Sequence, residues 1–270
     1  MGSGGVSCKI TISNQRTISK WNLIFRHRFR HGYIFLIGDD FYFFNDRKPL
    51  STSEDLTVVF YPMSERISGL CIRDKNNKFI GINSTLTYGR QRFTAAHELC
   101  HLFYHESFTS IVCAKDIDKN KDPLEKEADM FASYFLAPYE ALNDFIRTKL
   151  KKQNKNLDVS DIVKIEQYFG LSRQATLWRL INDGYLSFDE AGPMKTGIIL
   201  SAQRLGFDTR LYLPTPEDKQ YSTFGKYIKM AEELKDKNLI SKGKYEELLL
   251  DAFRGDIVYG LNTEGEERYD

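Results

Sequence analysis

The spacing of apolar residues divides the chain into a strand-rich part and a helical part. Between residues 20 and 83, short runs of Val, Ile, Phe and Tyr alternate with Gly, Asp and Asn, as in "GYIFLIGDDFYFFND", "LTVVFYP", "SGLCIRD" and "KFIGINS". Runs of this length and composition predict β-strands, and the polar breaks predict turns. We therefore expect a small mixed sheet with hairpin turns at residues 38–40 and 74–77.

After Gly89 the apolar residues recur at helical spacing, which predicts a mostly buried helix over residues 90–105. The polar stretch "AKDIDKNKDPLEKE" predicts an exposed loop that ends at Pro123, a residue favoured in the first turn of a helix. The next helix should span about residues 123–136, and another should begin at Pro138. We therefore expect three helices in succession after the sheet.

Two short helices separated by Gly170 have helix-turn-helix proportions over residues 157–187, with Ser160 and Ser172 as expected N-caps. The second helix could present polar residues to a DNA groove, or it could pack on the rest of the protein, which is the interpretation we favour. The polar residues in question are Arg173, Gln174, Thr176 and Arg179.

The rest of the chain predicts a strand at "TGIILSAQ" (residues 196–203), a Pro-containing loop and two charged helices around residues 223–253. Together these elements predict an α+β fold. We expect a first domain at residues 6–153, a helix-turn-helix-like helical region at 154–190, and a C-terminal α/β segment of regulatory or sensor role at 191–270.

Composition narrows the class of protein. Lys and Arg number 38 against 37 Asp and Glu, so no global charge imbalance draws the chain to nucleic acid or to an anionic membrane. The four cysteines lack CxxC spacing and there is no signal peptide, which indicates reduced thiols. No apolar run approaches the roughly 18 residues of a membrane span. We therefore expect a soluble cytoplasmic protein without a membrane partner.

Three of the five histidines lie within residues 97–105. His97 and His101 are four residues apart, so on a helix both imidazoles can reach one ion. Glu98 lies between them, where it can take a proton from a metal-bound water, and the sequence is a complete H-E-x-x-H motif. A short motif can arise by chance, and a helix with two hydrogen-bonded histidines is the alternative.

A hydrolytic zinc site needs a third protein ligand, and the segment "LEKEADMFASYFLAP" offers one. Glu125 and Asp129 are one helical turn apart, so Glu125 can bind the ion while Asp129 accepts the ring N–H of a ligand histidine. Glu127 is the rival ligand, ranked second because no acid or amide follows it four residues later. A solvated carboxylate is the alternative for Glu125.

The stretch "FIGINSTLTYGRQRFTAAHELCHLFYH", followed by "EKEADMFASYFLAP", resembles the ImmA/IrrE family of zinc metallopeptidases over about residues 78–138. The resemblance implies that His97, His101 and Glu125 bind Zn²⁺ and that Glu98 is the general base. It also implies that residues 78–83 are an edge strand able to pair with an extended substrate.

Members of that family typically cut a helix-turn-helix repressor encoded beside them, which releases transcription of mobile-element, stress or antiphage-defence genes. The resemblance therefore implies a site-specific zinc endopeptidase with such a repressor as its substrate. The alternative is a non-proteolytic DNA-interacting or antitoxin-like regulator that retains a zinc site.

Three further features are open to two interpretations. Cys113 could reach the open zinc position from a loop and keep the enzyme latent, or be a plain loop cysteine. His105 could contact substrate or pack at the helix end. The segment "FRHRFRHGY", residues 25–33, interleaves arginines with aromatics as a site for an activating single-stranded DNA would, although an exposed strand is favoured.

Overall fold

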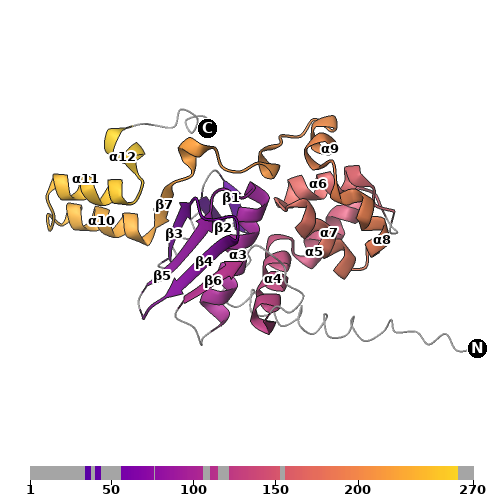
Figure 1. Cartoon of the computed structure of the whole chain (residues 1–270), viewed down its shortest axis with the longest axis horizontal. Helices are drawn as coiled ribbons and strands as arrows, with labels where there is room; N and C mark the ends of the chain where they lie inside the picture. Colours follow the sequence, from indigo (N-terminus) through magenta and orange to yellow (C-terminus); the bar gives the residue numbers. More distant parts are fainter. Residues whose placement is uncertain are drawn as a thin grey trace, which may run out of the picture.

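A five-stranded mixed sheet occupies the middle of the structure, a computed structural model that describes residues 34–37, 40–43, 56–75, 77–105, 110–114, 122–152 and 156–260 (Figure 1). The strand order is β6-β4-β5-β3-β7, with β3 and β5 parallel and the other neighbours antiparallel. The strands are β3 (Leu56–Tyr61), β4 (Ile67–Arg73), β5 (Lys78–Asn83), β6 (Ser110–Ala114) and β7 (Ser222–Gly225). With its helices, this sheet confirms the predicted α+β class.

The expected hairpins are present. Strands β1 (Ile34–Ile37) and β2 (Asp40–Phe43) pair antiparallel, although residues 38 and 39 between them lie outside the described residues. Strands β4 and β5 also pair antiparallel, and the Asp74 amide donates to the Asn77 carbonyl at 2.9 Å to close their turn. Residues 25–33, the basic and aromatic segment, lie outside the described residues.

The expectation that residues 78–83 form an edge strand is wrong. Strand β5 lies between β4 and β3, and its last four residues are buried. Its nearly continuous apolar sequence is typical of a strand that is covered on both faces. Among the strands that the structure describes, the edge on this side of the sheet is β6, in a stretch that the sequence predicted to be a loop.

Two helices carry the H-E-x-x-H motif and the acidic segment after it, α3 (Tyr88–Tyr104) and α4 (Pro123–Leu136), and they pack against each other. Helix α4 has the predicted bounds, because Asp122 caps its first turn, Pro123 takes the first helical position, and the helix ends before Pro138. Most of α3 is buried, as predicted, and it also contacts β4 and β5.

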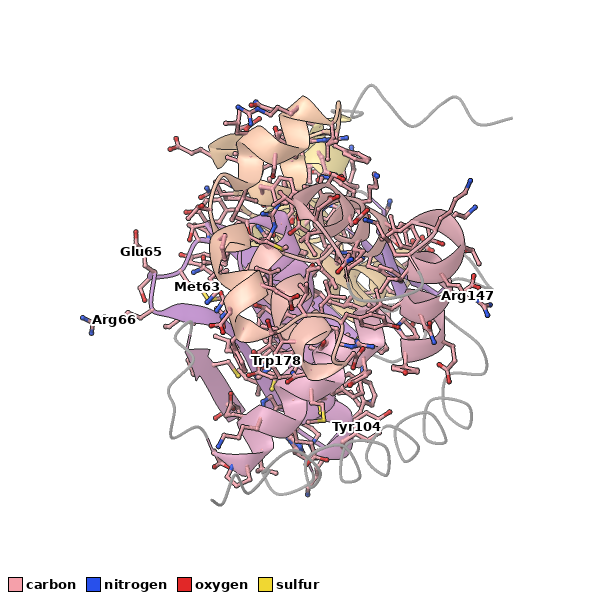
Figure 2. The ribbon with its side chains drawn as sticks, turned by 90° about the vertical axis from the view of Figure 1, so that its right-hand side faces the viewer. Met63, Glu65, Arg66, Tyr104, Arg147 and Trp178 are labelled. Carbon is pink, nitrogen blue, oxygen red and sulfur yellow. The ribbon has the colours of Figure 1, made fainter. Side chains whose placement is uncertain are left out.

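Polar side chains fix two segments next to α3. Asn83, at the end of β5, accepts a hydrogen bond from the Met63 amide at 3.0 Å and donates to the Ile67 carbonyl at 2.7 Å, which fixes the turn between β3 and β4. Figure 2 shows Glu65 and Arg66 projecting outward from this turn. At the end of α3, Arg73 of β4 donates to the Leu102 and His105 carbonyls at 3.1 and 2.9 Å. The carboxyl end of the helix that carries the motif is thus tied to β4.

One side of the molecule is helical. It contains α5 (Tyr139–Asp144), the π-helical turn η1 (Phe145–Lys149), α6 (Val159–Phe169), α7 (Arg173–Asn182), α8 (Phe188–Ala191), η2 (Gly192–Lys195) and α9 (Ile198–Arg204). The predicted turn is confirmed, with Gly170 at φ +65° and the Ser172 hydroxyl accepting the Ala175 amide. The prediction that Ser160 is the N-cap of α6 is wrong. The N-cap is Asp158, whose carboxylate accepts hydrogen bonds from two amides of the first turn.

Helix α7 packs on the rest of the protein, and its polar face is not available to DNA. Arg173, Thr176 and Arg179 are buried, while Leu177 and Leu180 belong to the same hydrophobic core as the central sheet. Of the four polar residues noted in the sequence, Gln174 alone is exposed. This arrangement agrees with the packing interpretation.

The strand predicted at residues 196–203 is wrong, since this segment forms α9. Gly197 begins it at φ +64°, and Ala202 is buried against Val163 of α6 and Tyr212. A short apolar run such as Ile-Ile-Leu does not distinguish strand from helix by its period. The position of α6 therefore decides the conformation.

The C-terminal part returns to the sheet. It comprises η3 (Arg210–Tyr212), η4 (Glu217–Lys219), β7, α10 (Lys226–Asp236), α11 (Lys242–Asp251) and α12 (Gly255–Tyr259). The two charged helices are confirmed, but residues 222–225 form β7, which pairs with β3. Helices α10–α12 lie on the opposite side of the sheet from α6–α9 (Figure 1). Among the described residues, no helix combines the length and apolar character that a bilayer crossing requires.

Candidate metal centre

His97 and His101 project from one face of α3, one turn apart, and their Nε2 atoms lie 3.1 Å from each other. Both side chains are buried. Glu125 reaches the same point from α4: its Oε2 lies 3.3 Å from His97 Nε2, and its Oε1 lies 3.2 Å from His101 Nε2. The structure thus brings together two imidazoles and one carboxylate.

These separations agree with a shared cation. A tetrahedral ion with bonds of about 2.0–2.1 Å places its ligands about 3.3–3.4 Å apart, close to the 3.1–3.3 Å between these three groups. Imidazole nitrogen and carboxylate oxygen are both ordinary zinc ligands. The donor set therefore fits a zinc ion.

Asp129 orients His97. Its Oδ1 lies 3.0 Å from His97 Nδ1, so it can accept the Nδ1–H and leave Nε2 facing Glu125. Burial alone would lower the pKa of His97, but the hydrogen bonds to Asp129 and Glu125 outweigh it and raise the pKa to about 9. Burial alone would raise the pKa of Glu125, but hydrogen bonds from His101 and His97 hold this pKa well below its usual range. His97 therefore favours its protonated form and Glu125 its ionised form.

His105 supports His101 in a similar way. The Nδ1 atoms of His101 and His105 are 2.8 Å apart, and His105 Nε2 lies 3.7 Å from Glu127 Oε2. Burial and the neighbouring His101 lower the pKa of His105. Sequence reasoning missed this contact, although the spacing of four residues between the two histidines was a signal for it. Glu127, the rival ligand, lies beside His105. The carboxylate that contacts both His97 and His101 is that of Glu125.

Glu98 is fully buried beside the histidines, and neither of its carboxylate oxygens has a hydrogen-bond partner of ordinary geometry among the described residues. Burial raises its pKa despite the opposing charge of His97. Space for it depends on Gly69 of β4, where a Cβ atom would lie 3.1 Å from Glu98 Oε1 and 2.5 Å from Thr94 Cγ2. A buried, unsatisfied carboxylate with a raised pKa is well suited to accept a proton.

Cys113 is the fourth member of the cluster. Its Sγ lies 3.9 Å from Glu125 Oε1, and the candidate ligand atoms of His97, His101, Glu125 and Cys113 all lie within 4.8 Å of one another. The residue belongs to strand β6, so its expected location in a loop is wrong. Burial, together with the charges of Glu98 and Glu125, raises the pKa of this thiol. A cation among these groups would favour the thiolate instead.

Cys71 and Cys100 line the buried surroundings of the cluster. Both are fully buried and belong to the hydrophobic core. Burial raises the pKa of Cys71, and the charge of Glu98 adds to the effect. No pattern in the sequence indicated that Cys71, which is far from the motif in the chain, would lie near Glu98.

Comparison with known proteins identifies the fold that carries this cluster. Residues 53–180 match the peptidase M78 family model, described as an IrrE N-terminal-like domain. The chain is also similar to "Uncharacterized immunity region protein 2" of Bacillus phage phi105, with 28% identity over 109 residues, which are 40% of this chain. The match spans 66% of that relative, just under two thirds of its length. The family match includes both helices of the cluster.

Proposed function

Because residues 53–180 make this chain a member of the ImmA/IrrE family of peptidases, we propose that it is a zinc-dependent endopeptidase that cuts a helix-turn-helix repressor. The observation that carries the proposal is the convergence of two imidazoles and one carboxylate beside the buried carboxylate of Glu98. A metal-binding histidine pair with an adjacent base is the arrangement used in metal-assisted hydrolysis.

In this proposal His97, His101 and Glu125 hold Zn²⁺, and Asp129 and His105 orient the two imidazoles from behind. A zinc ion there would polarise a peptide carbonyl and lower the pKa of water. Glu98 accepts the proton of the attacking water and passes it to the leaving amine, a role that its raised pKa supports.

We propose that Cys113 takes the remaining ligand position in a resting form of the enzyme. Support comes from its location within the 4.8 Å cluster and from its burial, which leaves little room for a substrate carbonyl. Moving β6, or releasing its thiol, would open the position. The proposal therefore includes a latent state.

Strand β6 is also the natural place for substrate to bind. One of its edges pairs with β4, and no strand of the described residues pairs with its outer edge, where an extended peptide could add. Val112 on this strand is 61% exposed, whereas Cys113 next to it faces the cluster. An edge of five residues favours a short, defined recognition sequence.

The substrate class rests on the family and on the phage relative, whose printed name places it in an immunity region. We propose that cleavage occurs in the cytoplasm and derepresses mobile-element, stress or antiphage-defence genes. Residues 6–153 would be the peptidase domain, 154–190 its helix-turn-helix-like region and 191–270 a regulatory or sensor segment. Single-stranded DNA binding at residues 25–33 stays a prediction about an activating ligand.

The alternative, a regulator that binds DNA without cutting protein, has less support. The candidate recognition helix α7 buries three of the four polar residues that the sequence analysis singled out, Arg173, Thr176 and Arg179. A buried carboxylate, Glu98, also lies beside the candidate ligands, and a purely structural metal site does not need one.

The test is cleavage of the helix-turn-helix protein encoded by the neighbouring gene. Purified full chain and that protein are mixed with and without a chelator, and the wild type is compared with Glu98→Gln and Cys113→Ala. We expect a discrete fragment that disappears with chelator and with Glu98→Gln. An intact partner with wild type and with Cys113→Ala alike would contradict the proposal.

A further inference from the structure

We propose that Cys71 is a positioning residue for Glu98, whose carboxylate accepts a hydrogen bond from the Cys71 thiol and is held by it beside the metal centre. The consequence for catalysis rests on the proposed function, in which Glu98 is the general base. The existence of the hydrogen bond does not depend on that function.

The strand pairing places Cys71 next to Glu98. Gly69 and Cys71 are two residues apart on β4, so their Cβ positions face the same side of the sheet. That side is the one that α3 covers, because a Cβ atom on Gly69 would lie 3.1 Å from Glu98 Oε1. Cys113 of β6 is the register partner of Gly69. The Glu98 carboxylate therefore lies over β4, with Cys71 further along this strand and Cys113 on the neighbouring one.

A buried carboxylate needs hydrogen-bond donors. Glu98 is fully buried, and an ionised group that is buried without donors destabilises the fold. Burial raises the pKa of Glu98, while hydrogen bonds from the thiols of Cys113 and Cys71 act to lower it. The two thiols therefore supply donors to a carboxylate that has no partner of ordinary geometry among the described N–H and O–H groups.

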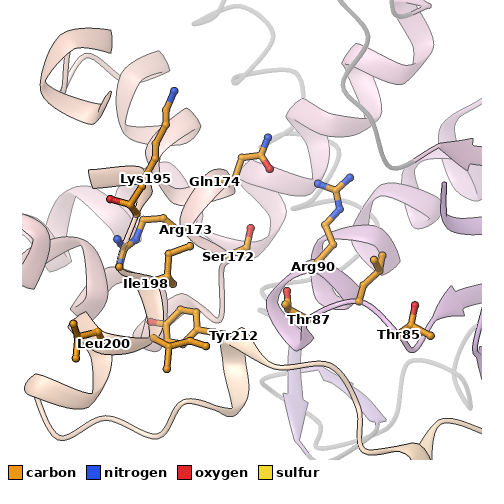
Figure 3. Close-up of a pocket in the computed structure, with 14 residues that line it drawn as sticks. Thr85, Thr87, Arg90, Ser172, Arg173, Gln174, Lys195, Ile198, Leu200 and Tyr212 are labelled. Carbon is orange, nitrogen blue, oxygen red and sulfur yellow. The ribbon is translucent and has the colours of Figure 1, made fainter. Parts of the chain in front are cut away.

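The open cavity nearest the start of α3 does not take their place. This cavity has a volume of about 760 Å³ and lies between the amino ends of α3 and α7 (Figure 3). Its lining includes Thr87, Arg90 and Ser172, but neither Glu98 nor Cys71 is among its described lining residues. The cavity therefore supplies no donor to Glu98.

Cys71 keeps its proton at neutral pH. Burial raises the pKa of its thiol, and the charge of Glu98 adds to the effect. A neutral thiol is a hydrogen-bond donor, although a weak one. Cys113 differs, because a thiol that binds a cation gives up its proton and no longer donates. In the resting form with Cys113 on the cation, Cys71 is thus the thiol that still donates to Glu98.

Cys71 is not a member of the candidate ligand group, which among the described residues comprises His97, His101, Cys113 and Glu125. A change at Cys71 therefore leaves every candidate ligand in place and acts through Glu98. We expect Cys71→Ala to bind Zn²⁺ with an affinity within about twofold of the wild type. A tenfold loss of affinity would assign Cys71 to metal binding and overturn the positioning role.

The direct experiment is infrared spectroscopy of the S–H stretching bands of the full chain, loaded with one equivalent of Zn²⁺. The Cys71 band is identified by its loss in Cys71→Ala. A thiol that donates to a charged acceptor makes a stronger hydrogen bond and absorbs at lower wavenumber than one that donates to a neutral acceptor. We expect the Cys71 band to move to higher wavenumber in Glu98→Gln, because this substitution keeps the shape of the side chain and removes its charge.

Cys100 provides the matched control in the same spectra. It is a fully buried thiol on α3 that belongs to the hydrophobic core, and burial raises its pKa as it raises that of Cys71. Its band, identified in Cys100→Ala, should keep its position in Glu98→Gln. The proposal is overturned if the Cys71 band does not move in Glu98→Gln, or if the Cys100 band moves by as much.

Cleavage of the helix-turn-helix protein from the neighbouring gene tests the catalytic consequence. Cys71→Ala should lower kcat about tenfold to a hundredfold, because the carboxylate is no longer held in place. KM should stay the same, since Cys71 contacts Glu98 and not the substrate. Cys71→Ser, which restores a donor, should recover most of the loss. An unchanged kcat in Cys71→Ala would refute the positioning role. A wild type that cuts nothing would contradict the proposed function instead, and the infrared bands would still decide whether the hydrogen bond exists.

Discussion

Replacing Asp129 by Asn tests how the structure orients the candidate ligand His97. The Asp129 carboxylate accepts the His97 Nδ1–H at 3.0 Å, and the substitution keeps the shape while it removes the charge. Changes to such partners cost about 10–100-fold in metal affinity, or about 1.4–2.7 kcal/mol. We expect the dissociation constant for Zn²⁺ to rise by that factor in Asp129→Asn.

The assay is competition for Zn²⁺ with a chromophoric chelator at neutral pH. Glu127→Gln is the matched control, because Glu127 lies on the same helix but contacts His105, at 3.7 Å, whereas the acidic partners of His97 are Glu125 and Asp129. Its zinc affinity should stay within about twofold of the wild type, since no charge near His97 changes. The reasoning is refuted if Asp129→Asn binds Zn²⁺ as tightly as the wild type, or if Glu127→Gln loses as much affinity.

Three other substitutions test separate parts of the structure. Cys113→Ala should increase repressor cleavage without a trigger, measured by gel electrophoresis, and unchanged or lower cleavage would argue against the latent state. Glu166→Gln leaves the buried Arg173 without its ion-pair partner, so unfolding in urea should show a loss of about 3–5 kcal/mol; a loss below 1 kcal/mol would contradict this. Asp158→Ala removes the cap of α6 and should cost about 1 kcal/mol at pH 7. Hydrogen bonds from Ser160 lower the pKa of Asp158, so this difference is complete above pH of about 4 and should disappear as the pH falls through the lowered value. A difference that persists in acid would refute the assignment.

Local signals in the sequence were sufficient for the helices of the candidate site. The bounds of α4 follow from Asp122, Pro123 and the stop before Pro138, which act within one or two turns. The Gly170 turn between α6 and α7 is likewise local, because it depends on a left-handed conformation that glycine adopts without strain.

The position of each strand in the sheet could not be predicted in the same way. Strand β5 is central because β3 pairs with it in parallel. The other edge of β3 pairs with β7, which lies about 140 residues further along the chain than β5. No local pattern encodes such pairings. For the same reason, the sequence did not indicate that Cys113 would lie on a strand beside α3.

Site chemistry was more predictable than sheet topology, because helical spacing fixes which side chains share a face. His97, His101 and Glu125 lie within hydrogen-bond range of one another, as the spacing suggested. The contact between His101 and His105 has the same spacing of four, but the sequence did not reveal its role. The orientation of His105 depends on its burial and on Glu127, which comes from another helix.

X-ray absorption at the zinc edge, measured on the full chain loaded with one equivalent of Zn²⁺, tests the central claim most directly. The account predicts two imidazole ligands and a carboxylate oxygen at about 2.0–2.1 Å, with one sulfur at about 2.3 Å from Cys113 in the resting form. In Cys113→Ala the sulfur should disappear while both imidazoles stay. A spectrum without imidazole scattering, or one unchanged by His101→Ala, would contradict the account.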